Sequence, residues 1–200
     1  MMCRHPALFG LLFLAWLNAG AAPGRAAILS SPPAPAAAKE GQTPEKIATR
    51  NNAASLLFQL VEDEKNAGLL LLVKGNRPDI NSLVKAISTT AGEADKNLLV
   101  LAKADPSLDL HAIDLPAGEV AVRAAITKTK THQLLLSTGD NFEFALLLAQ
   151  ADALSYGYNL AQTAWENSSE PAQREIFSAL RDTMKAQYQQ VIAFIRAPIK

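Results

Sequence analysis

Two histidines are the residues of this sequence best suited to metal chemistry, because imidazole nitrogens bind transition metals near neutral pH. His111 lies in a segment between two predicted helices, and His132 lies inside a predicted helix. They are not paired at the spacing of three or four residues that puts two ligands on one face of a helix. We therefore predict a surface or core role for both, and we assign no metal ligand and no cofactor.

A short polar stretch comes nearest to a nucleophilic arrangement. Ser137 and Thr138 place hydroxyl groups close to the carboxylate of Asp140. The same pattern is what the start of a helix requires, and the sequence has neither a Gly-x-Ser-x-Gly elbow nor a glycine-rich phosphate loop. The only cysteine, Cys3, precedes a predicted cleavage site. We assign no catalytic residue and expect a non-enzymatic protein.

A ridge of small residues is the sharpest local pattern in the chain. Every fourth position is small over one stretch: Ala145, Ala149, Ala153, Gly157 and Ala161. Such a ridge lets a neighbouring helix approach closely. It predicts either a tight helix contact within the chain or the seam of a homodimer. Tyr156 and Trp165 lie near the ridge, and we expect them at the edge of the core.

A run of five consecutive apolar residues is the candidate interaction surface, consisting of Leu69, Leu70, Leu71, Leu72 and Val73. A helix that is apolar on all sides must be covered on all sides. If the segment 106–116 does not cover the run, it forms an exposed patch of the kind that binds a partner. The partner expected is an unknown protein or a component of the cell envelope. The sequence shows no clustered basic face of the kind that binds nucleic acid, so we expect no nucleic-acid partner.

Helical periodicity dominates the chain from residue 43 onward. We predict helices near 44–74, 78–105, 116–136, 141–167 and 171–197, and Gly139 leaves open whether 116–167 is one kinked helix or two. The second helix has an apolar stripe from Ile80 to Leu101 that we expect to be buried, and the third has Val120, Ile126 and 134–136 as expected apolar anchors. No stretch alternates with period two, so no sheet is expected. The prediction is an all-α, antiparallel four-helix bundle, with room for a fifth, shorter helix. An irregular crossover loop at 106–116 is expected to be pinned by its aliphatic residues, Leu108, Leu110, Ile113 and Leu115.

In the number and length of its helices, the chain resembles the ferritin-like four-helix bundles over roughly residues 44–197. That resemblance implies a di-metal site made by Glu from two helices and Glu-x-x-His from the other two. No Glu-x-x-His occurs in this sequence. The glutamates on the long helices fall at or beyond the edge of the apolar stripes: Glu62, Glu64, Glu93, Glu143 and Glu175.

Three functions follow from these observations. The first is a binding or scaffolding protein that uses a helix face or a bundle end. The second is a ferritin-like metal or redox protein with a degenerate site. The third is a carrier of an apolar small molecule, in a gap between helices lined by Leu, Ile and Phe.

The first 21 residues have the pattern of a cleaved signal peptide. A basic start at Arg4 is followed by an apolar run from Ala7 to Leu17 and the small residues Ala19-Gly20-Ala21. The run is far shorter than the roughly 20 residues that span a bilayer. Cleavage removes Arg4 from 19 basic and 19 acidic residues, which leaves a net charge near −1. We expect export to the periplasm or the exterior, with no transmembrane segment after cleavage.

The next 21 residues, 22–42, are rich in Ala and Pro, and we predict a disordered tether. Thr43-Pro44-Glu45 then has the residues of a helix start, with Thr as the cap and Pro in the first turn. The predicted helical domain is therefore 43–200.

Overall fold

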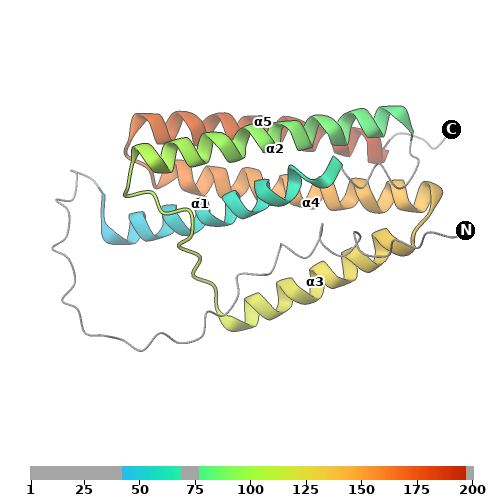
Figure 1. The fold of residues 1–200 in the computed structure, drawn as a ribbon, viewed down its shortest axis with the longest axis horizontal. Helices are drawn as coiled ribbons and strands as arrows, with labels where there is room; N and C mark the ends of the chain where they lie inside the picture. Colours follow the sequence, from blue (N-terminus) through green and yellow to red (C-terminus); the bar gives the residue numbers. More distant parts are fainter. Residues whose placement is uncertain (1–41, 69–76, 197–200) are drawn as a thin grey trace, which may run out of the picture.

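The computed structural model describes residues 42–68 and 77–196. Within these ranges the structure has five α-helices, a 3₁₀ turn at Ala67 and Gly68, and no strand, which confirms the all-α prediction there (Figure 1). The predicted signal at 1–21, nearly all of the tether and the run Leu69–Val73 lie outside the described residues. In chain order the helices are α1 (Pro44–Glu64), α2 (Pro78–Ala104), α3 (Ala117–Leu136), α4 (Gly139–Glu166) and α5 (Pro171–Arg196).

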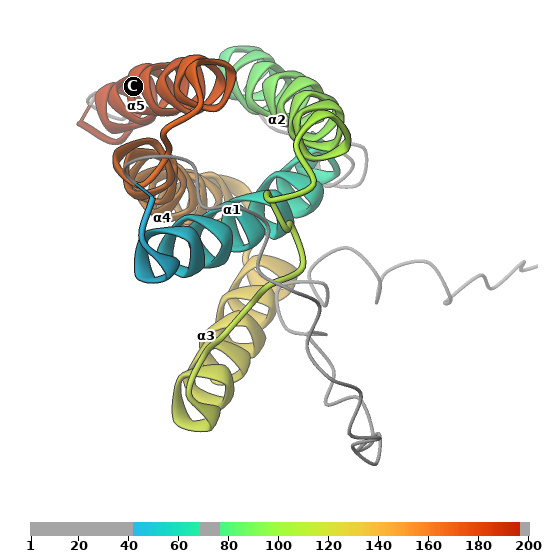
Figure 2. The same cartoon turned by 90° about the vertical axis from the view of Figure 1, so that its left-hand side faces the viewer.

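Four of the helices share one apolar core. α4 packs against α5 and α1, and α2 packs against α1 and α5 (Figure 2). The stripe predicted for α2 is buried along its whole length, from Ile80 to Leu101. The side chains at the centre of the core are almost fully enclosed: Leu57, Val61, Val84, Ile87, Leu98, Leu146, Phe177 and Val191.

α3 lies outside this core and packs chiefly against α4 (Figure 2). Only Thr127 and Leu134 are buried on it. Ile126 and Leu136, which periodicity predicted as anchors, are 46% and 68% exposed, so that prediction is wrong. A helix with a single close neighbour buries only a narrow stripe, and the remaining apolar side chains stay on the surface.

The chain returns from α2 to α4 over a longer path than predicted. The loop 106–116 was expected to make the whole crossover, but α3 carries the chain from the end where α2 stops to the end where α4 starts (Figure 1). The fifth helix was predicted to be shorter than the others. With 20 residues, α3 is one residue shorter than α1. α3 and α4 are separate helices, because Gly139 takes a left-handed φ of 54° at the junction.

α1 begins where the sequence predicted but ends about ten residues earlier than predicted. Thr43 caps the start as expected, accepting a hydrogen bond from the Lys46 amide at 3.3 Å. The helix ends at Glu64 and not near residue 74. Three acidic side chains, Glu62, Asp63 and Glu64, stand at the end where the helix dipole is negative and disfavours them. The hydroxyl of Ser88 donates to the Lys65 carbonyl at 2.6 Å and so gives this carbonyl at the end of α1 a hydrogen-bond partner.

A buried arginine fastens the loop after α2 to the core. Arg50 on α1 is fully buried, and its guanidinium donates to the carbonyl of Ser107 and to Gln173 Oε1 on α5, the latter at 3.2 Å. Gln173 Nε2 donates in turn to Asp105 Oδ2 at 3.0 Å. Burial lowers the pKa of Arg50, and the carboxylates of Asp105 and Glu170 act in the opposite direction. The guanidinium thus joins α1, α5 and the loop.

Further polar contacts hold the loop along α1. Ser55 Oγ donates to the Asp109 carbonyl at 3.0 Å and accepts from the Ala112 amide at 2.9 Å. Asn52 makes two hydrogen bonds to the backbone of Asp114, each 3.2 Å long. Of the aliphatic residues expected to pin the loop, Leu108 and Leu110 are buried, whereas Ile113 and Leu115 are half-buried.

The ridge of small residues on α4 contributes a close helix contact within the chain. Gly157 is buried between α1 and α5. A Cβ at this position would lie 2.7 Å from Met184 Sδ and 2.8 Å from Leu60 Cδ2. Favourable contacts between such atoms need about 3.5–4.0 Å, so only glycine fits without a shift of its neighbours. Ala161 and Ala153 are also buried, while Ala145 and Ala149 are half-buried.

Replacing Gly157 with Ala tests this contact. The added methyl group overpacks a filled site, and this cost of about 1–3 kcal/mol outweighs a helix-propensity gain of at most about 1 kcal/mol. We expect a lower free energy of unfolding in urea denaturation. Gly92→Ala in the middle of α2 is the control, because its Cβ would meet nothing closer than Lys65 Cβ at 3.9 Å. This control should stabilise the protein, and equal effects of the two variants would contradict the packing argument.

Replacing Arg50 with Met tests the buried network. The variant leaves Gln173 Oε1 without its buried donor and the Ser107 carbonyl with only the donor Asn51 Nδ2, and breaking such a buried charged network typically costs about 2–4 kcal/mol. Urea denaturation should show a loss of this size. Arg196→Met at the exposed end of α5 is the matched control and should change stability by less than about 0.5 kcal/mol. A loss in Arg50→Met no larger than that of the control would show that the network does not stabilise the fold.

Candidate functional site

A cleft of about 350 Å³ lies between α3 and the core, with walls from α1, α3 and α4. We call it the α3–α4 cleft. Its volume falls in the range of roughly 300–1,000 Å³ found for small-molecule sites. Its apolar walls are Ile126 on α3 and the small side chains Ala149 and Ala153 on α4, next to the ring of Tyr156. Because α3 contacts chiefly α4, the space beside that contact is left unfilled.

One ion pair and one hydrogen bond along the cleft fix α3 relative to α4. Arg123 pairs with Glu119 one turn earlier at 2.8 Å, and its second nitrogen donates to the Tyr156 hydroxyl at 2.8 Å. Lys130 reaches across to Asp152 on α4 at 2.6 Å. The guanidinium of Arg123 also lies 5.1 Å from the centre of the Tyr156 ring. Both cations that line the cleft are therefore already paired with carboxylates.

A third carboxylate in the cleft has an amide as its partner. Glu64, the last residue of α1, accepts a hydrogen bond from Gln150 Nε2 on α4 at 2.9 Å. No ion pair within 42–68 and 77–196 involves Glu64. Removal from water raises the pKa of Glu64 from 4.5 to about 7, against the opposing effect of the Gln150 hydrogen bond. At neutral pH this carboxyl group exists in both protonation states.

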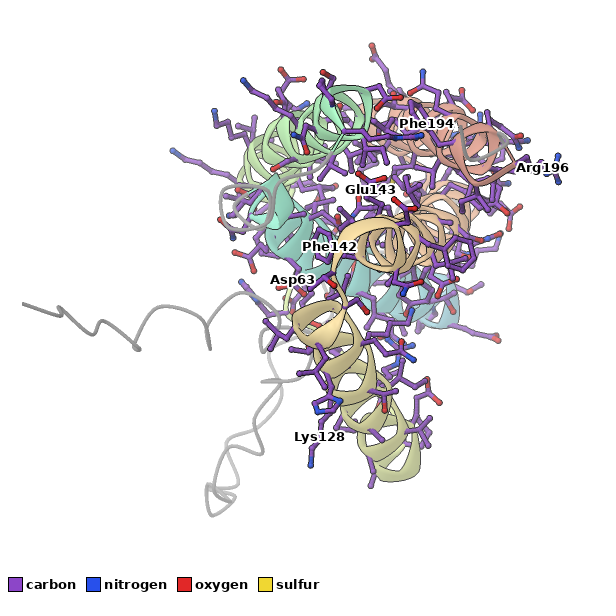
Figure 3. All side chains as sticks on the ribbon, turned by 90° about the vertical axis from the view of Figure 1, so that its right-hand side faces the viewer. Asp63, Lys128, Phe142, Glu143, Phe194 and Arg196 are labelled. Carbon is purple, nitrogen blue, oxygen red and sulfur yellow. The ribbon has the colours of Figure 1, made fainter. Side chains whose placement is uncertain are left out.

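Asp63 precedes Glu64 and lies in the space between the end of α1 and α3, whereas Lys128 points away from the core (Figure 3). Desolvation raises the pKa of Asp63 from 3.8 to about 7, with further contributions from the neighbouring charges of Glu64 and Glu62. Lys65 acts in the opposite direction. The end of α1 therefore carries two carboxyl groups that hold protons near neutrality.

Gln150 brings a second acceptor to the same wall. Its side chain is 2% exposed, and its Oε1 has no hydrogen-bond donor in the described part of the chain. A buried acceptor without a donor costs about 1–3 kcal/mol, so such atoms in native proteins call for an explanation. Glu64 thus supplies the carboxylate oxygens of this part of the cleft, whereas Gln150 Oε1 is enclosed within the wall.

The residues singled out by sequence contribute unequally to this site. Ala149 and Ala153 of the small-residue ridge line the cleft. His111 is exposed in the loop, with its ring edge-on to Phe58 at 5.9 Å, and His132 is exposed on α3. Among the described residues, no three His, Asp or Glu side chains come together as metal ligands.

Sequence reasoning missed Glu64 and Gln150 as partners. Glu64 was placed at the edge of an apolar stripe, which gives no sign of a contact with α4. The available signal was weak: a run of three acids inside the helix predicted for 44–74, and one glutamine among the aliphatic residues of α4. Pairing them required the distance between α1 and α4.

No protein family model matches this chain, and neither does any curated protein or solved structure. Within the ranges that the structure describes, no helix is both long and apolar enough to cross a bilayer. The interpretation of the site therefore rests on the geometry of the cleft.

The raised pKa values predict how stability depends on pH. Glu64 and Asp63 bind protons more tightly in the folded than in the unfolded chain, so their contribution is complete below about pH 4 and is lost as pH rises through about 7. Glu64→Gln removes one of the two groups. The unfolding free energy of Glu64→Gln, relative to wild type, should therefore increase by about 1–3 kcal/mol between pH 5 and pH 7.5.

Urea denaturation at the two pH values measures this difference, and Asp63→Asn should give a change in the same direction. The double variant should show the weakest decline of stability with pH. A Glu64→Gln protein whose stability falls with pH as steeply as that of wild type would contradict the assignment.

Proposed function

We propose that this chain is an exported, non-enzymatic binding protein that holds a small ligand in the α3–α4 cleft. In this proposal α1, α2, α4 and α5 form an antiparallel four-helix bundle, and α3 is an outer helix that forms one wall of the site. The proposal keeps the binding role predicted from sequence and combines it with the small-molecule carrier considered there. Export rests on the predicted signal at residues 1–21.

The observation that carries the proposal is the cleft itself. α3 is held to α4 by the Lys130–Asp152 ion pair, the hydrogen bond from Arg123 to Tyr156 and a narrow buried stripe, and a volume of about 350 Å³ stays open beside it. A helix that served only to connect α2 with α4 would bury more of its apolar surface if it lay flat in a groove of the core. The arrangement supports a function in which something else occupies this space.

The lining of the cleft favours an amphipathic ligand. A carrier of a purely apolar molecule was expected to have a cavity lined by Leu, Ile and Phe. The cleft has Ile126 and two alanines on its walls, with charged and amide groups along them. Sites that combine apolar walls with a few placed polar groups are typical of ligands that have both kinds of surface.

A protein-scaffolding role is the second candidate, because large apolar side chains stand exposed on α3 and α4. Val122 and Phe144 are 54% and 53% exposed, and Leu148 is 42% exposed. Exposed apolar groups favour a protein partner when they form a continuous patch. The two functions differ in a measurable way, since filling the cleft removes a small ligand and leaves these outer side chains in place.

A cleft-filling substitution tests the proposed function. Ala149→Trp places a large ring in the cleft, and Ala186→Trp on the exposed face of α5 is the matched control. The probe is Nile red, a neutral dye whose fluorescence rises in apolar surroundings. Fluorescence titration should show saturable binding to the wild type and the control, weakened at least tenfold in Ala149→Trp. No binding to wild type, or unchanged binding to Ala149→Trp, would overturn the proposal.

A further inference from the structure

We propose that the α3–α4 cleft selects an amphipathic primary amine, with its ammonium group on Glu64 and its apolar tail along Ile126, Ala149 and Ala153. This inference rests on the proposed function and adds the chemical class of the ligand. It depends on the charges, the acceptor atoms and the apolar walls of the cleft.

The balance of charges in the cleft favours a cation. Arg123 and Lys130 are each within 2.8 Å of a carboxylate oxygen, on Glu119 and Asp152 respectively. An anionic ligand would have to displace one of these carboxylates. Glu64 is the carboxylate in the cleft that has no cation within the described residues, and its sole hydrogen-bond partner there is the neutral amide of Gln150. A ligand ammonium completes a third ion pair and displaces nothing.

The free acceptor in the cleft points to a cationic N–H donor. Glu64 accepts when ionised, and its hydrogen-bond partner in the described part of the chain is the Gln150 amide. A primary ammonium carries three donors and a positive charge, an alcohol carries one neutral donor and a carboxylate carries none. An ammonium therefore forms a charged hydrogen bond with Glu64. The alcohol forms only a neutral one, and the carboxylate repels Glu64.

The apolar part of the ligand is set by the walls beside Glu64. Ile126 lies on α3, one turn from Lys130, and lines the cleft. It is 46% exposed. Ala149 and Ala153 face it from α4 with no side chain beyond Cβ. An alkyl chain between these walls would bury apolar surface from both sides.

Binding of an amine is coupled to the proton on Glu64. The groups that face this carboxyl are Asp63 on its own helix, the Arg123–Glu119 pair on α3, and the Lys130–Asp152 pair between α3 and α4. An alkylamine stays cationic between pH 6 and 8, whereas Glu64 passes from mostly protonated to mostly ionised, because its pKa lies near 7. The amine should therefore bind about tenfold more tightly at pH 8 than at pH 6.

Three ligands of equal chain length test the selectivity: decylamine, decanol and decanoate. Each is titrated by calorimetry at pH 6 and pH 8 and by displacement of Nile red, with wild type, Glu64→Gln and Glu93→Gln. Glu93 is an exposed acid on α2 and serves as the matched control. Decylamine should bind wild type and Glu93→Gln at least tenfold more tightly than decanol, and decanoate should bind weakest. In Glu64→Gln the amine should lose its advantage and its pH dependence, while Nile red and decanol still bind.

The outcomes separate this inference from the function on which it rests. Nile red binding to wild type, lost in Ala149→Trp, together with equal affinities for decylamine and decanol, would overturn the amine and leave the cleft as a binding site. An amine preference that persists in Glu64→Gln would also overturn it, and retained Nile red binding shows that this variant is folded. If no ligand and no dye binds wild type, both proposals are wrong.

Discussion

The course of the chain depends on one buried cation. Arg50 carries its charge into the core, where the Ser107 carbonyl and the Gln173 amide oxygen replace its water. An uncompensated guanidinium in that place would be too costly to keep, so the loop after α2 must lie where its carbonyl reaches the arginine. The position of the loop fixes the point from which α3 begins, and α3 forms one wall of the cleft. The geometry of the candidate site thus follows from a contact on a different part of α1.

The cleft shows how charge can hold a helix without filling the space beneath it. A helix docked by aliphatic side chains approaches its neighbour until no gap remains, because each added contact is favourable. α3 is instead held at Lys130 and Arg123, whose long side chains bridge to α4 and leave a space beside them. The small side chains of Ala149 and Ala153 enlarge this space from the α4 side. This spacing by two long polar side chains leaves room for the ligand that we propose, beside a helix that also serves as the crossover.

Periodicity predicted the helices well and their environment less well. The stripe on α2 and the cap at Thr43 could be predicted, since both are local patterns that the chain satisfies with its own neighbours. The same reasoning placed Ile126 in the core, because an apolar residue at helical spacing gives no sign of how many neighbours its helix has. Glu64 and Gln150 could not be paired from sequence, since 86 residues separate them and neither lies on a repeating pattern. The ridge of small residues on α4 predicted that a neighbouring helix could approach closely. It did not show that Gly157 packs in the core while Ala149 borders a cleft.

The narrow contact of α3 has a consequence for how the molecule opens. Two buried side chains, the exposed Lys130–Asp152 ion pair and the hydrogen bond from Arg123 to Tyr156 join this helix to the rest, whereas α1, α2, α4 and α5 are joined by a continuous apolar core. Detaching α3 exposes little of that core, so the free energy of this local opening lies far below that of global unfolding. The molecule accordingly has two cooperative units. Amide hydrogens of α3 exchange with solvent when α3 alone detaches, while those at the centre of α4 exchange only when the whole fold is lost.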